Sequence, residues 1–167
     1  MHKMVLEVLG RRVPRPPLSE LLATVDNVST GGPVEINKKE PSQKGPAHNF
    51  TGDVWFDVVA KGQEPSRLRV NKVRFAPGAR TAWHSHAVGQ TLHVTDGVGR
   101  VQSRGGEVVE MRAGDTIHTP PGEWHWHGAA PEHFMAHLAM WEAPSSDSAS
   151  EVAWGDAVTD EEYLGST

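Results

Sequence analysis

Apolar and polar residues alternate in short segments along the middle of this chain. Successive side chains of a strand point to opposite faces, so this alternation predicts β-strands. The two clearest segments, 54–59 and 68–75, are rich in β-branched and aromatic residues. Shorter strands are predicted at 81–86, 90–95, 99–104, 108–112, 115–119, 124–127 and 134–141.

Glycine and proline residues separate these segments at close spacing. The predicted turns are Pro77-Gly78, Asp96-Gly97, Gly105-Gly106, Ala113-Gly114, Pro120-Pro121-Gly122 and Ala130-Pro131. Many short strands joined by glycine-rich turns are typical of a β-sandwich or barrel. No long helical pattern interrupts the strands, so the sequence predicts an all-β domain.

The two ends of the chain differ from this barrel-like middle. Residues 1–33 are predicted to be an N-terminal extension, with a short helix at 19–25 after a proline-rich stretch. This extension is either a partly disordered tail or an arm that docks on a partner subunit. We place the β-barrel at 34–142, followed at 143–167 by a linker and a tail that packs on the barrel. In that tail, Thr159 and Glu162 have capping-box spacing for a short helix.

Composition narrows the classes of function. The 167 residues are enough for one domain with a hydrophobic core, and the net charge of −5 argues against nucleic acid or an anionic membrane surface as partner. No segment approaches the roughly 20 apolar residues of a membrane span, and the apolar run at the start is too short for a signal peptide. The chain has no Cys, so any metal must be bound by His, carboxylate, amide or water. We expect a cytoplasmic protein.

Two short clusters indicate a metal site. His84 and His86 are two residues apart and therefore share one face of a strand, and Gln90 follows after a turn. His125 comes from a later strand, so the fold must bring it to the others. Either cluster alone is more often an accident of a polar strand than a metal site. Together, with glycine and proline at the turns between them, they predict that His84, His86, Gln90 and His125 bind one metal ion.

The chemistry of these four ligands suggests the role of the metal. Imidazole nitrogen and amide oxygen suit divalent Mn, Fe, Co, Ni or Zn, and four protein ligands leave about two positions of an octahedron open. All four ligands are neutral, so the ion would keep its full positive charge and act as a strong Lewis acid. We therefore expect a small-molecule substrate at the open positions.

The two clusters resemble the signature motifs of the cupin superfamily. The first motif is matched by Gly78, His84, His86, Gln90 and Gly97, with Gln where Glu is usual. The second is matched by Gly114, Pro120, Gly122 and His125, with Ala129 where Asn is usual. The resemblance implies the cupin double-stranded β-helix, a jelly-roll barrel.

Longer segments are similar to a subgroup of small single-domain bacterial cupins. The similar segments, within residues 34–163, are 44–52, 75–84, 89–92, 121–131 and 158–163. Some members of this subgroup are manganese-dependent hydroxynitrile lyases, and a shell of three His and one Gln is a feature of the group. The resemblance implies Mn as the metal, with Fe, Co, Ni or Zn as alternatives, and a lyase reaction at the metal.

Two further histidines are candidate proton carriers. His127 shares a strand face with His125 and should point into the same cavity, and His137 lies on the last predicted strand with Ala139 and Trp141 on its face. An inward Trp141 would narrow that cavity. Alternatively, His137 is a core histidine whose hydrogen bonds are satisfied and which has no role in catalysis. The resemblance implies that these two positions line the pocket and that a His serves as acid–base.

Three tryptophans, Trp83, Trp124 and Trp126, should face away from the histidines. We expect a second sheet or another subunit to cover them, because three exposed tryptophans would form an apolar patch that promotes association. A homo-oligomer, either a dimer or a tetramer, is therefore predicted.

Three functions remain open from the sequence. The most specific is hydroxynitrile lyase chemistry, in which the metal acts as Lewis acid while a C–C bond breaks or forms. The alternatives are a metal-dependent dioxygenase or isomerase on the same centre, and a non-catalytic cupin that binds a metal or ligand.

Overall fold

The computed structural model describes residues 32–145 and 150–165. The chain divides into two compact units, Met1–Asn37 and Lys38–Thr167. Of the first unit, only residues 32–37 are described, and they contain no helix or strand. The predicted helix at 19–25 lies outside the described residues, and the predicted boundaries at 33 and 142 remain predictions.

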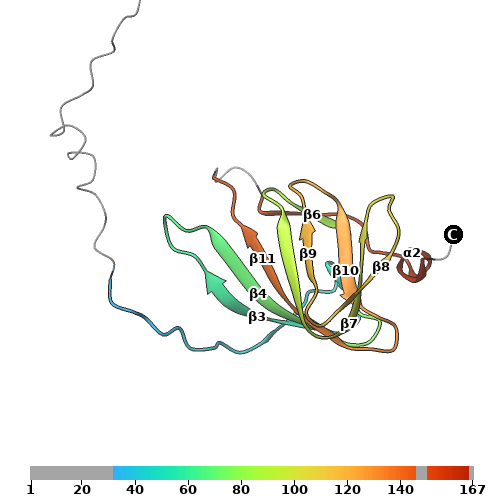
Figure 1. Ribbon diagram of the computed structural model, residues 1–167, viewed down its shortest axis with the longest axis horizontal. Coiled ribbons are helices and arrows are strands. Elements are labelled where there is room, and N and C mark those ends of the chain that lie inside the picture. The colour runs from blue at the N-terminus through green and yellow to red at the C-terminus, as the bar shows by residue number, and fades with distance from the viewer. Residues whose placement is uncertain (1–31, 146–149, 166–167) are drawn as a thin grey trace, which may run out of the picture. The chain divides into compact units, whose positions relative to one another are not determined.

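In its described residues, the second unit contains twelve strands and one short helix (Figure 1). The strands are β1 (Gln43–Lys44), β2 (Phe50–Thr51), β3 (Val54–Lys61), β4 (Leu68–Phe75), β5 (Arg80–Thr81), β6 (His84–His86), β7 (Gln90–Ser103), β8 (Val109–Arg112), β9 (Thr116–Thr119), β10 (His125–Ala129), β11 (Met135–Glu142) and β12 (Val152–Trp154). The helix is α2 (Asp160–Leu164). The prediction of an all-β domain is confirmed.

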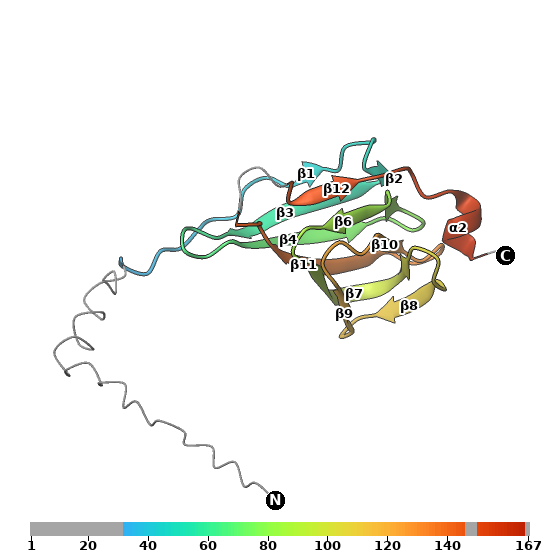
Figure 2. The same cartoon turned by 90° about the horizontal axis from the view of Figure 1, so that it is seen from above.

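The strands form one curled antiparallel sheet with the order β1-β3-β4-β11-β7-β10-β5-β2 (Figure 2). Strand β7 joins the two halves of this sheet. Its first part pairs with β11 and β9, and its last part, from Val98 on, pairs with β10 and β8. Strand β6 pairs with β10 on one side and with β12 on the other, so the C-terminal strand completes the half that carries the histidines.

The predicted turn at Asp96-Gly97 is wrong. Residues 90–103 form one continuous strand, and its pairing with β11 shifts register between Ala136 and His137. Gly97 has a positive φ of 76°, and a Cβ placed there would lie 1.9 Å from the carbonyl oxygen of Phe134. The glycine therefore bends the strand and allows close backbone contact, as at a β-bulge, without ending the strand.

The main hydrophobic core fills the inside of the curled sheet. Its largest fully buried members are Phe75, Leu92, Met111 and Met135. They come from four different strands, and packing among them fixes how the two halves of the sheet face each other. Next to this core, β6, β10 and β11 also carry the buried histidines.

A second cluster on the opposite face explains the tryptophans. Trp126 is fully buried and Trp83 nearly so, and both pack against Val158 and Tyr163 of the C-terminal tail. The Tyr163 hydroxyl donates to the carbonyl oxygen of Ala129 at 2.7 Å. The expected cover from a second sheet or another subunit is therefore wrong, because the chain's own tail covers this face. The homo-oligomer remains a prediction, but the tryptophans no longer support it.

The tail is held by a helix cap and by a buried arginine. Thr159 caps α2, and its capping box with Glu162 is formed as predicted. Arg80 donates to the carbonyl oxygen of Val158 and to the Asp160 carboxylate, at 2.9 and 2.7 Å. The predicted packing of the tail on the barrel has this physical basis within the described residues.

Candidate metal centre

Neighbouring strands bring the histidines together. His84 lies directly opposite His125 in the antiparallel pair β6–β10. Because residues two apart share a face, His86 and His127 extend the same inward-facing row on their strands. Gln90 begins β7 and lies opposite Trp141 of β11, while His137 sits further along β11. Thus β6, β7, β10 and β11 contribute all the residues predicted for the site.

These side chains are almost completely shielded from solvent. His84, His86, Gln90, His125, His127 and His137 are each exposed by 4% or less. The imidazole centroids of His84 and His125 are 4.3 Å apart, and those of His84 and His127 are 5.1 Å apart. His86 lies slightly further out, with its ring 5.4 Å from that of His84. Burying five imidazoles together costs free energy unless their ring nitrogens find partners, because buried polar groups need hydrogen bonds or a metal.

Backbone carbonyls orient two of the rings. Nδ1 of His84 lies 3.0 Å from the carbonyl oxygen of Ala82, and Nδ1 of His125 lies 3.0 Å from that of Glu123. A carbonyl only accepts, so each Nδ1 carries the proton and donates it. Each Nε2 is then left with a free lone pair. A carbonyl on the far ring nitrogen is the arrangement that fixes a histidine as a metal ligand.

Gln90 supports the same interpretation. Its Oε1 lies 2.9 Å from Nε2 of His125. With Nδ1 of His125 donating to Glu123, this contact brings two lone pairs together unless the amide is turned or a cation lies between them. Burial lowers the pKa of His125, which disfavours a second proton on that ring. A metal ion between the two atoms would satisfy both.

Several buried ring nitrogens have no hydrogen-bond partner among the residues that the structure describes. They are Nδ1 and Nε2 of His86, Nε2 of His127 and Nδ1 of His137. Buried nitrogens without partners are expensive, and a bound ion is one of the recognised reasons for them. The donor set of the site therefore fits a divalent metal.

One group of ring nitrogens close enough to hold a metal differs from the predicted shell. Ligand atoms of His84, His125 and His127 all lie within 4.8 Å of one another, and His86 is not in this group. His127 thus lies closer to the predicted ligands His84 and His125 than its predicted role as proton carrier requires. The predicted ligands His84, His86, Gln90 and His125, and the predicted proton carriers His127 and His137, remain predictions.

His127 and His137 form a pair beside this group. Nε2 of His137 lies 3.2 Å from Nδ1 of His127, and their ring centroids are 4.9 Å apart. One of these nitrogens must donate and the other accept. If Nδ1 of His127 donates, its unpartnered Nε2 is left with a lone pair facing the cavity. His137 is therefore more than an isolated core histidine.

Burial keeps the whole cluster uncharged. It lowers the pKa of His86 to about 4 and that of His137 to about 3. Burial also holds the pKa values of His84 and His127 well below their usual range, and neighbouring histidines lower them further. Neutral imidazole is the form that binds a metal, so these rings are ready as ligands at neutral pH.

The histidines line a small inner cavity of about 90 Å³. Besides His84, His86, His127 and Gln90, its wall contains Phe50, Asn71, Val73, Thr81, Ala139, Trp141, Val152 and Trp154. No carboxylate is among these residues. Trp154 of β12 stacks on His84, with centroids 4.9 Å apart and planes inclined by 30°. The sequence predicts only that the tail packs on the barrel. It does not predict the place of Trp154 in the wall, because β12 follows the linker and its position depends on pairing with β6.

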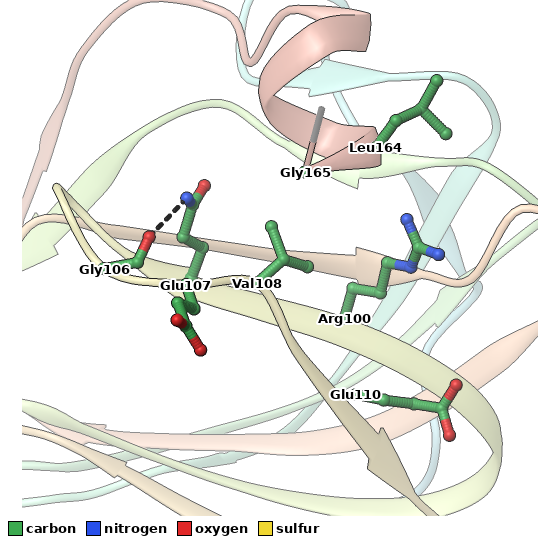
Figure 3. A pocket seen from close by; sticks show the side chains of 8 residues that line it. Arg100, Gly106, Glu107, Val108, Glu110, Leu164 and Gly165 are labelled. Atoms are coloured by element: carbon green, nitrogen blue, oxygen red, sulfur yellow. Dashed lines mark hydrogen bonds between the residues drawn. The ribbon is translucent and has the colours of Figure 1, made fainter. Parts of the chain in front are cut away.

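A larger hollow elsewhere lacks this chemistry. It measures about 440 Å³ and lies between β7, β8 and the end of α2 (Figure 3). Arg100, Glu107, Glu110 and Leu164 line it, and the Gln102 side chain donates to the carbonyl oxygen of Gly106 at 2.8 Å. It contains no histidine among its lining residues, so the small histidine-lined cavity is the candidate functional site.

Comparison with known proteins agrees with this geometry. A family model described as "Cupin domain" matches residues 71–141. A curated protein of Granulicella tundricola, named (R)-mandelonitrile lyase, is 48% identical over 124 residues, which cover 74% of this chain and 92% of that protein.

Solved structures show the same fold. A cupin-like protein from Thermotoga maritima is 36% identical with a TM-score of 0.68, covering 80% of this chain and 98% of that one. A cupin-2 domain from Rhodospirillum rubrum is 16% identical with a TM-score of 0.58, covering 80% and 84%. This chain belongs to the cupin family, with relatives of the hydroxynitrile lyase type. The predicted cupin fold is confirmed, and the cupin domain together with the three-histidine cluster points to a divalent metal site. Within its described residues, the protein has no helix with the length and apolar character needed to cross a membrane.

Proposed function

We propose that this protein is a metal-dependent lyase that cleaves hydroxynitriles into a carbonyl compound and hydrogen cyanide, and forms them in reverse. The observation that carries the proposal is the buried histidine cluster, in which ligand atoms of His84, His125 and His127 lie within 4.8 Å of one another and several ring nitrogens have no hydrogen-bond partner. The chain is also 48% identical to a protein named as a mandelonitrile lyase. The substrate class is a small neutral molecule with a hydroxyl beside a nitrile.

The proposed ligands are His84, His86, Gln90 and His125, with Mn as the expected metal. Two of the imidazoles are already oriented by backbone carbonyls, and Gln90 faces His125. When bound, the metal would supply a Lewis acid that lowers the pKa of a coordinated hydroxyl and attracts the developing negative charge. Because no carboxylate lines the cavity, nothing in its wall offsets that charge.

His127 is the proposed base. Its Nε2 lacks a partner and its side chain lines the cavity, whereas His137 lies behind it. With Nδ1 of His127 donating to Nε2 of His137, the lone pair on Nε2 of His127 accepts the substrate hydroxyl proton. The carbonyl forms as the C–C bond breaks, the bonding pair leaves with cyanide, and the proton passes from His127 to cyanide. His137 holds the tautomer of His127 and stabilises the charged ring during the step.

The wall of the cavity excludes water from this chemistry. Trp154 stacks over His84, and Phe50 packs edge-on against Trp154 with ring centroids 5.9 Å apart. An apolar wall strengthens each electrostatic contact inside the cavity and limits proton exchange with solvent.

The proposal is tested by the rate of cyanohydrin cleavage at mildly acidic pH. Acetone cyanohydrin and mandelonitrile are supplied to manganese-loaded protein, and the carbonyl product is measured. Cleavage of at least one substrate above the buffer rate, which is lost on chelation and restored by Mn, is expected. A rate equal to buffer for both substrates overturns the proposal. Oxygen uptake with the iron-loaded protein would instead support the dioxygenase alternative.

A further inference from the structure

Two hollows meet where β7 begins and β11 ends. One is the inner histidine-lined cavity of about 90 Å³, and the other is an open surface groove of about 330 Å³. The groove is lined by Leu68, Val88, Gly89, Gln90, Thr91, His118, Met140, Trp141 and Glu142. Gln90 and Trp141 are the two residues that line both hollows, and they are direct cross-strand partners. These two side chains therefore form the partition between the groove and the inner cavity.

The indole of Trp141 is held in place at this partition. Its Nε1 donates to Oε2 of Glu151 at 3.0 Å, and Arg69 donates to Oε1 of the same carboxylate at 3.1 Å. Arg69 is also the cross-strand partner of Trp141 in β4. The Trp141 ring faces His86, with the two centroids 5.4 Å apart. A charged carboxylate shared by an arginine and an indole makes stronger hydrogen bonds than a neutral acceptor, so the ring has a defined position.

The inner cavity is small for an aromatic substrate. A buried apolar cavity of about 150 Å³ is known to accept benzene, which sets a useful scale. The cavity here has about 90 Å³, and a metal ion would take part of it. Acetone cyanohydrin has six non-hydrogen atoms, as benzene has, and mandelonitrile has ten, so a phenyl substituent reaches the partition before two methyl groups do.

We propose that Trp141, held by Glu151, is the specificity-determining residue of this site and restricts it to hydroxynitriles with small aliphatic substituents. This inference rests on the proposed lyase function for its substrate class. Removing the indole joins the cavity to the groove, so an aromatic substituent gains room without any change in the proposed ligands.

The experiment compares kcat/KM for acetone cyanohydrin and mandelonitrile, whose ratio is insensitive to partial loss of folded protein. We expect the wild-type protein to prefer acetone cyanohydrin, and Trp141→Ala to shift the ratio toward mandelonitrile by at least about 10-fold. Trp141→Phe is a smaller change that removes Nε1, and it should shift the ratio less. This variant replaces Trp141→Ala in the test if the alanine variant does not fold. Glu151→Ala should shift the ratio in the same direction, whereas Glu151→Gln, which can still accept from the indole, should shift it less. Trp55→Ala removes an exposed indole from β3 and serves as the matched control.

A binding measurement separates failure of the partition from failure of the lyase. Cobalt-loaded protein is titrated with acetate and with benzoate, and the visible absorption of the metal is followed. Acetate should perturb the wild-type spectrum at a concentration at least about 10-fold lower than benzoate, and Trp141→Ala should remove most of that difference. If no cyanohydrin is cleaved while this pattern holds, the lyase proposal fails and the size restriction stands. Equal binding of both anions by the wild type, or an unchanged ratio in Trp141→Ala, overturns the role of Trp141. Failure to take up cobalt contradicts both proposals.

Discussion

His84 and His125 lie directly opposite each other on β6 and β10, with ring centroids 4.3 Å apart and each Nδ1 bonded to a backbone carbonyl two residues earlier. The two rings thus have the same local arrangement, one on each strand. In each case a carbonyl just before the strand orients the ring, so the lone pair on Nε2 is available to bind a metal. Two ligands are therefore fixed by short segments of sequence, and only their pairing depends on the fold.

The His127–His137 pair gives a prediction about proton transfer. His127→Gln and His137→Gln should each lower kcat for cyanohydrin cleavage, by about 10²- to 10⁴-fold for the proposed base, because the proton loses its acceptor. The exposed His133 offers a matched control, and His133→Gln should retain wild-type kcat. The measurement is steady-state kinetics with the metal content determined for each variant.

Metal content decides how the result is interpreted. If His127→Gln loses the metal along with activity, His127 is a ligand, in line with its place in the tight nitrogen group, and the proposed division of roles is wrong. If both variants keep the metal and full kcat, neither histidine moves the proton.

The bend in β7 gives a prediction about stability. Gly97→Ala should strongly destabilise the protein, because its Cβ would overlap the carbonyl oxygen of Phe134 in addition to the strain of a positive φ. Gly78 has nearly the same φ, 77°, but nothing lies within 4 Å of a Cβ there. Gly78→Ala should therefore cost only the backbone term, about 1–3 kcal/mol. Urea unfolding of the two variants measures the difference, and equal losses would show that the close contact is not important.

Asp57 and Arg74 give a prediction about pH. Two hydrogen bonds, of 2.8 and 3.1 Å, join them, and the bond from Arg74, followed by that from Ser42, holds the pKa of Asp57 well below its usual range. A carboxyl group with a lowered folded-state pKa stabilises the fold at pH values above its unfolded pKa, about 3.9, and this contribution is lost as the pH falls below it. The wild-type protein should therefore exceed Asp57→Asn in free energy of unfolding at pH 7, and the difference should shrink toward pH 2. A difference that is constant with pH would contradict this.

Much of the fold follows from local sequence. The alternation at 68–75 predicts β4 to the residue, and Thr159 with Glu162 predicts the start of α2. The turn predicted at Gly97 is wrong because a glycine has two possible roles in a strand. It can end the strand, or it can bend the strand and allow a neighbouring backbone to come close. Only the tertiary contact with Phe134 decides between these roles.

The site was predictable to a different extent. Spacing alone placed His84 and His86 on one face, and the fold brings His125 beside them as expected. The sequence predicts that His127 points into the same cavity as His125. It does not predict that a ring nitrogen of His127 lies within 4.8 Å of those of His84 and His125, because that distance depends on how the strands pack. The roles of Trp154 and Glu151 were also hidden, since both belong to a segment beyond the linker that pairs with β6 only in the folded chain.

The central claim is that the buried histidines bind one divalent metal ion, and elemental analysis of the purified protein tests it most directly. We predict about one equivalent of a divalent transition metal per wild-type chain, lost in His84→Ala and in His125→Ala while circular dichroism still shows the β-rich fold. The exposed His133→Ala should keep its metal. A wild-type protein without metal after supply of Mn, or unchanged metal in both His84→Ala and His125→Ala, would contradict the claim.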